Sequence, residues 1–84
     1  MRTKVAGVSF RQNEVALVSK QDDITMLKCL EYNGLKLLHK KSGNVVGYIP
    51  KPLISAFEKY TDTDGKVVDV NKWDGPTGLV VEFN

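Results

Sequence analysis

Ser42-Gly43-Asn44-Val45-Val46-Gly47-Tyr48-Ile49-Pro50-Lys51-Pro52-Leu53 is the stretch that decides the predicted fold. Its Ser-Gly-Asn turn lies between two short apolar runs, 35–40 and 45–49, and this pattern predicts a β-hairpin. Pro50 and Pro52 have no backbone N–H to donate in a central ladder, so the second strand should end by Ile49. Pro52 suits the first turn of a helix, where the missing N–H costs nothing. The stretch therefore predicts a hairpin followed directly by a helix.

The remainder of the chain predicts more short elements on both sides of this hairpin. A helix is expected over 53–60, and a second one, capped by Asn13, over 14–20, although the valines of 14–20 also fit a strand. Short strands with turn connections and two small helices predict a mostly β or α+β class, as a curled antiparallel sheet or small barrel. The further strands are expected over 4–10, 24–31, 66–70 and 79–83.

The segment 24–31 carries apolar side chains on both of its faces. Ile24, Met26 and Leu30 should point one way, and Leu27 and Cys29 the other. A strand that is apolar on both faces is typical of the middle of a sheet. We therefore expect this strand to be central.

Composition indicates one ordinary globular domain spanning 1–84. Hydrophobic residues make up 42% of the chain and charged residues 26%. The net charge of +2 is too small to indicate nucleic-acid binding by itself. Basic side chains do gather around the central turn, where a solvated face is as good an interpretation as a binding patch; they are Lys36, His39, Lys40, Lys41 and Lys51.

The chain has one cysteine, Cys29, and one histidine, His39. One cysteine cannot form an intramolecular disulfide, and this pair cannot supply a Cys/His zinc site. We expect Cys29 to be a buried packing residue, and we expect no metal or cofactor. The sequence has no signal-peptide pattern and no apolar run of membrane-spanning length, so a cytoplasmic setting is the default expectation.

Catalysis is not expected from the sequence. No partner is marked for His39, and no motif of a serine hydrolase, zinc protease or P-loop enzyme occurs. The Asp-rich turn 61–65 lacks the flanking carboxylates of an EF-hand calcium loop. Its aspartates, and the later ones, are typical turn formers; they are Asp62, Asp64, Asp69 and Asp74.

Binding through aromatic and basic side chains fits the sequence better. Phe10, Tyr48 and Lys51 are the main candidates, because aromatic rings stack on unpaired bases and lysines meet phosphates. Each also has an ordinary structural explanation. Phe10 fits a core position better than a binding position, and Tyr48 and Lys51 fit a packed ring and a solvated helix start. Trp73, in a loop rich in glycine and proline, fits either a lid on the core or a contact residue.

The layout and two stretches of this chain resemble the HIRAN domain, which occurs in certain SWI/SNF-type DNA-repair helicases and in bacterial proteins. Val5-Ala6-Gly7-Val8-Ser9-Phe10 resembles the opening strand of that family, and residues 43–53 resemble its Gly-x-x-Val-Gly-Tyr segment. The resemblance implies a small OB-like or SH3-like antiparallel barrel of about six strands with two short helices. It also implies binding of single-stranded DNA, at a free 3′ end in the helicase members. Phe10 would then stack on a base, and Tyr48 and Lys51 would take groove-edge and phosphate roles.

Two departures from the family pattern concern the same site. Ser9 stands where the helicase members have an arginine, and 30–35 replaces their Asn-Pro-Tyr-Asp loop. Tyr32 is the candidate substitute for the loop tyrosine, but no aspartate accompanies it. The prediction is a nucleic-acid-binding module in which Phe10 and Tyr32 stack on bases, Tyr48 lines the groove, and Lys40, Lys41 and Lys51 meet phosphates. The alternative, which both departures favour, is a protein-interaction or structural domain of the same fold that lacks DNA binding.

Overall fold

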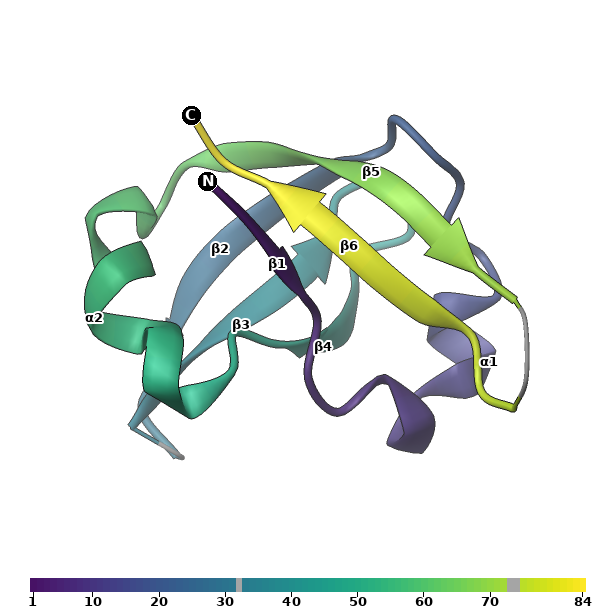
Figure 1. The fold of residues 1–84 in the computed structure, drawn as a ribbon, viewed down its shortest axis with the longest axis horizontal. Coiled ribbons are helices and arrows are strands. Elements are labelled where there is room, and N and C mark those ends of the chain that lie inside the picture. The colour runs from purple at the N-terminus through teal and green to yellow at the C-terminus, as the bar shows by residue number, and fades with distance from the viewer. Residues whose placement is uncertain (32, 73–74) are drawn as a thin grey trace.

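In the computed structural model, which describes residues 1–31, 33–72 and 75–84, six antiparallel strands form one curled sheet. The strand order is β1-β6-β5-β2-β3-β4 (Figure 1). This arrangement confirms the predicted mostly β, antiparallel class and the central position of the strand near 24–31. The strand bounds are β1 Arg2–Lys4, β2 Asp23–Cys29, β3 Gly34–His39, β4 Asn44–Tyr48, β5 Asp64–Asn71 and β6 Gly78–Glu82.

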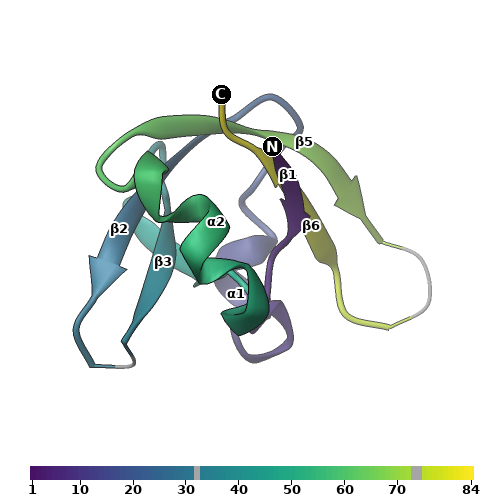
Figure 2. The same ribbon diagram turned by 60° about the vertical axis from the view of Figure 1, so that its left-hand side comes forward.

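The predicted helix over 53–60 is a succession of three short turns. A 3-10 turn η1 (Val8–Phe10) and the helix α1 (Gln12–Val15) lie between β1 and β2, and η2 (Lys51–Leu53), α2 (Ile54–Phe57) and η3 (Glu58–Tyr60) follow β4. Pro52 lies in the first turn, as its fixed φ and missing N–H predict. In Figure 2, α2 crosses the opening between β3 and β1. Phe57 is buried there, so this helix closes one end of the core.

The N-terminal predictions are partly wrong. The strand predicted over 4–10 stops at Lys4, because Gly7 adopts a left-handed φ of 78° that turns the chain into η1. The helix predicted over 14–20 runs instead from Gln12 to Val15, with Arg11 rather than Asn13 at its N-cap. Tighter three-residue turns continue it as far as Val18.

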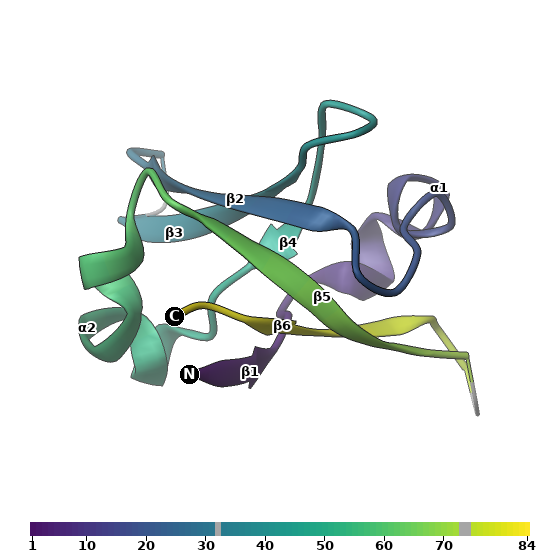
Figure 3. The same ribbon diagram turned by 90° about the horizontal axis from the view of Figure 1, so that it is seen from above.

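The curled sheet brings its two outer strands together. Ala6, just beyond β1, and Tyr48, at the end of β4, exchange two backbone hydrogen bonds, Ala6 N to Tyr48 O at 2.8 Å and Tyr48 N to Ala6 O at 2.9 Å. Figure 3 shows β2 and β3 on one side of the molecule and β1 and β6 on the other, with β5 crossing between them. The register shifts within the β3–β4 pair and within the β5–β6 pair. Such irregularities increase the local twist of the strands and so help the sheet to curl. The result is a barrel-like fold.

Gly47 permits this closure. A Cβ at Gly47 would lie 2.5 Å from the carbonyl oxygen of Ala6 and would collide with a methyl group of Val5. Any side chain would therefore separate the two outer strands. The glycine in the middle of β4 is explained by this close backbone approach.

The core lies inside the curl. Ile24 and Met26 are fully buried, and Cys29 is buried as predicted. Leu30 does not share their face: its side chain is 79% exposed, because β2 ends at Cys29 and Leu30 belongs to the following turn. In the described part of the chain, no helix has the length and apolar character to cross a membrane.

Candidate functional site

A groove of about 760 Å³ runs along the line where the sheet closes. Three segments line it: the connection after β1, the turn between β2 and β3, and the end of β4 with the helix entrance that follows. Phe10, Tyr48 and Lys51, three of the residues predicted for binding, all lie on this groove. The backbone pairing of Ala6 with Tyr48 thus brings together residues that are far apart in the sequence.

The floor of the groove is shaped by Gly7 and Tyr48. A Cβ on Gly7 would lie 3.3 Å from Cδ2 of the Tyr48 ring, which is tighter than ordinary packing. Gly7 therefore leaves room for the ring, and its left-handed φ directs the chain outward into η1. A glycine at position 7 is therefore explained both by its backbone conformation and by its packing against the Tyr48 ring.

Phe10 projects from this turn into solvent, with 90% of its surface exposed. The expectation that it would fill the core is wrong, because η1 turns it away from the sheet. The turn itself is well held. The Gln12 amide nitrogen donates to the carbonyl oxygens of Val8 at 2.7 Å and Thr77 at 3.1 Å, and its amide oxygen accepts from Thr77 N at 2.8 Å. An apolar ring is thus presented to solvent from an anchored backbone.

Arg11 is a groove residue that the sequence analysis missed. Its Nη2 donates to the Tyr48 hydroxyl at 2.9 Å, and its guanidinium carbon lies 5.6 Å from the centre of the Tyr48 ring. Arg11 directly follows Phe10 in the sequence. That adjacency was the available signal.

Lys51 supplies the second positive charge of the groove. Its side chain is exposed at the start of η2. Within the described ranges it forms no ion pair or side-chain hydrogen bond. Its ammonium group is therefore available to an anionic ligand.

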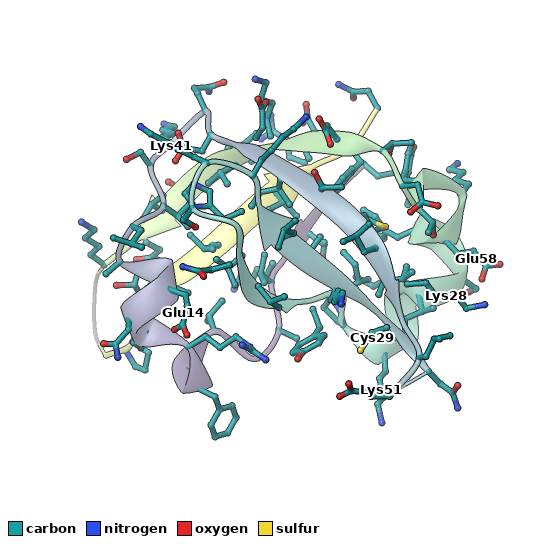
Figure 4. The ribbon with its side chains drawn as sticks, turned by 180° about the vertical axis from the view of Figure 1, so that it is seen from behind. Glu14, Lys28, Cys29, Lys41, Lys51 and Glu58 are labelled. Atoms are coloured by element: carbon teal, nitrogen blue, oxygen red, sulfur yellow. The ribbon has the colours of Figure 1, made fainter. Side chains whose placement is uncertain are left out.

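Lys40 and Lys41 lie elsewhere. They belong to the β3–β4 turn and border a separate, smaller hollow of about 320 Å³. Figure 4 shows Lys41 and Lys51 at opposite ends of the molecule. Lys40 Nζ lies 2.7 Å from Asp64 Oδ2, and this contact raises the pKa of Lys40 and, together with a hydrogen bond from Thr25, lowers that of Asp64. The structure therefore separates these two lysines from the groove.

Tyr32, which was predicted to stack on a base, lies outside the described residues. Trp73, for which a core lid and a contact residue were both open, and Asp74 also lie outside them. Among the described histidine, cysteine, aspartate and glutamate residues, no three lie close enough together to hold a metal ion.

His39 has partners that the sequence did not mark. Its ring is buried, with Nδ1 2.7 Å from Ser42 Oγ and Nε2 2.8 Å from Asp22 Oδ2. A hydrogen bond from the Ser19 backbone N–H, and then the contact with His39, lowers the pKa of Asp22. An ionised carboxylate only accepts, so Nε2 carries a hydrogen, and in the neutral ring Nδ1 accepts from the Ser42 hydroxyl. Because the ring is 1% exposed, we interpret this cluster as a structural link between the 19–22 loop and the β3–β4 turn.

This cluster makes stability sensitive to acid. Because folding lowers the pKa of Asp22, its contribution to the free energy of unfolding is present above the ordinary carboxyl pKa of 3.8 and is lost as pH falls through the folded-state value. We expect Asp22→Asn to lose less stability than the wild type between pH 5 and pH 3, a range below the ordinary histidine pKa of about 6.5, so that the change reports the carboxylate. Urea denaturation at both pH values measures this difference. The exposed Glu58→Gln serves as control, and an equal acid loss in Asp22→Asn and the wild type would contradict the assignment.

Comparisons with protein-family models, curated proteins and solved structures find no match to this chain. A functional conclusion therefore depends on the geometry of the groove.

Proposed function

We propose that this chain is a single-stranded nucleic-acid-binding module whose groove holds single-stranded DNA. The observation that carries the proposal is the exposed ring of Phe10, held on an anchored turn beside a groove that also contains Arg11 and Lys51. Exposing an apolar ring this fully brings no benefit to folding, whereas a ring is the surface on which an unpaired base stacks.

Each groove residue matches a part of a nucleotide. Stacking of one base on an aromatic side chain contributes about 1–3 kcal/mol. The Arg11 guanidinium is planar and presents donors in a fork that fits phosphate, and the Tyr48 hydroxyl already restrains its position. Lys51 acts as a point charge for a second phosphate. A chain of two or three nucleotides could therefore place a base on Phe10 and phosphates on the two cations.

The resemblance to the HIRAN domain agrees with this proposal. The opening stretch and the Gly-Tyr stretch on which it depends meet at the Ala6–Tyr48 bridge. Arg11 also offers the groove an arginine that Ser9 does not. Recognition of a free 3′ end is a separate feature of the helicase members. Because the loop after β2 differs from theirs, end recognition is tested separately from single-strand binding.

Fluorescence anisotropy with a labelled ten-residue oligothymidylate at low salt tests the proposal. We expect saturable binding that weakens as salt is added, with a slope of about −1.4 in log K against log salt if two phosphates are contacted. Duplex DNA of the same length should bind more weakly, because its bases are not available for stacking. Oligomers with a 3′-hydroxyl and a 3′-phosphate distinguish end recognition from general single-strand binding. An absence of binding at low salt would contradict the proposal.

Lys51 and Lys40, which lie on either side of β4 in the sequence, provide a paired prediction. Lys51→Ala should weaken binding and make the salt slope about 0.7 less negative, because one phosphate contact is lost. Lys40→Ala removes the same charge from the chain but outside the groove, so it should leave the slope unchanged. The salt titration of both variants measures this difference. Equal effects from the two substitutions would show that only net charge matters.

A protein-interaction domain of the same fold is the second candidate. The observation in its favour is that large apolar side chains besides Phe10 are exposed, with Leu30 at 79% the most exposed of them. This function predicts no affinity for oligonucleotides of any kind. The anisotropy titration therefore separates the two functions directly.

A further inference from the structure

Glu31 is the acidic side chain of the groove among the residues that the structure describes. It lies in the turn between β2 and β3, and its side chain is exposed. In the described part of the chain its carboxylate receives no hydrogen bond and forms no ion pair, although Arg11 and Lys51 line the same groove. The groove therefore carries, beside two cations, one exposed carboxylate that no described side chain pairs with.

The chemistry of a nucleic acid restricts what this carboxylate can contact. An ionised carboxylate only accepts hydrogen bonds, and it repels phosphate. The favourable contacts that a single strand can offer it are therefore the N–H donors on base edges, which are accessible where bases are unpaired. Since Arg11 and Lys51 attract the phosphates, the part of the strand that can contact Glu31 is a base.

The four bases differ in how many adjacent donors they present. Guanine places N1–H and the N2 amino group side by side on its Watson–Crick edge, which matches the two oxygens of a carboxylate. Cytosine, adenine and thymine have no such adjacent pair, since each offers its N–H donors from a single position on that edge. A paired, charge-assisted contact is stronger than a single one.

We infer that Glu31 is a specificity-determining residue that makes the groove prefer guanine. This inference rests on the proposed function and adds the base that the groove selects. Glu31 would accept from N1–H and N2–H of one unpaired guanine while a neighbouring base stacks on Phe10.

The test uses a nonathymidylate with one central guanine, compared with the same oligomer carrying inosine at that position. Inosine lacks only the N2 amino group, and a single guanine cannot form multistranded structures readily. For the wild type we expect about tenfold tighter binding of the guanine oligomer, the effect of one charge-assisted hydrogen bond. Glu31→Gln should bind both oligomers within about twofold, since its amide has one acceptor. Glu58→Gln, an exposed carboxylate outside the groove (Figure 4), is the matched control and should keep the preference.

The outcomes distinguish the role of Glu31 from the single-strand binding on which it rests. Equal affinity of the wild type for guanine and inosine oligomers would overturn the role of Glu31 and leave single-strand binding intact. A guanine preference that persists in Glu31→Gln would overturn it as well, because another group must then read the base. No binding of any oligomer would overturn both the inference and the proposed function.

Discussion

Phe10→Ala is expected to weaken binding of single-stranded DNA by about fivefold to about 150-fold while leaving the free energy of unfolding unchanged. The loss follows from the removal of one stacking surface, which contributes about 1–3 kcal/mol per base. Stability should not change, because a ring that is 90% exposed makes almost no contribution to the core. Anisotropy titration and urea denaturation of the same preparation measure the two quantities.

Leu17→Ala is the matched control for this prediction. Leu17 is also apolar and exposed, at 58%, but it does not line the groove. Its removal should change neither binding nor stability. If Phe10→Ala retained full affinity, stacking on this ring would be excluded, and if it unfolded the protein, the exposed position of the ring would be wrong.

Gly47→Ala should lower the free energy of unfolding by about 2–4 kcal/mol. The added methyl group would meet the carbonyl oxygen of Ala6 at 2.5 Å and collide with Val5, so the outer strands must move apart. Overpacking costs about 1–3 kcal/mol, and each weakened backbone hydrogen bond of the closing bridge adds about 1 kcal/mol. The amides of Ala6 and Tyr48 should lose protection against hydrogen exchange first.

Gly43→Ala separates this steric effect from the general cost of replacing a glycine. Gly43 has a left-handed φ of 75°, and a Cβ there would meet nothing within 4 Å. Its replacement should therefore cost only about 1 kcal/mol, the price of the strained backbone. Equal destabilisation by the two substitutions would show that strand closure at Gly47 does not limit stability.

Short sequence patterns were sufficient to predict the central hairpin and the start of the helix that follows it. The Ser-Gly-Asn turn and the prolines at 50 and 52 specified the hairpin and the helix start, and both occur where they were expected. The error over 4–10 has one physical source. A glycine within an apolar run predicts a bulge or a close approach equally well, and only the folded chain shows that Gly7 takes a positive φ and turns Phe10 outward.

The site was harder to predict, because it depends on the closure of the sheet. Phe10, Tyr48 and Lys51 meet across the Ala6–Tyr48 bridge, a contact between segments more than 40 residues apart. The separation of Lys41 from Lys51 could have been foreseen. A five-residue strand lies between the turn and the helix entrance, and at about 3.3 Å per residue it keeps the two about 16 Å apart.

A nuclear magnetic resonance titration of the ¹⁵N-labelled protein with an oligothymidylate tests the central claim most directly, because it shows where a single strand binds. If the groove holds the strand, the largest changes in amide chemical shift occur around it, at Gly7, Phe10, Gly34, Tyr48 and Lys51. The amides of Lys40, Lys41 and Gly43, at the far turn, should not change. Shifts confined to that far turn, or no shifts at a saturating oligomer concentration, would contradict the account.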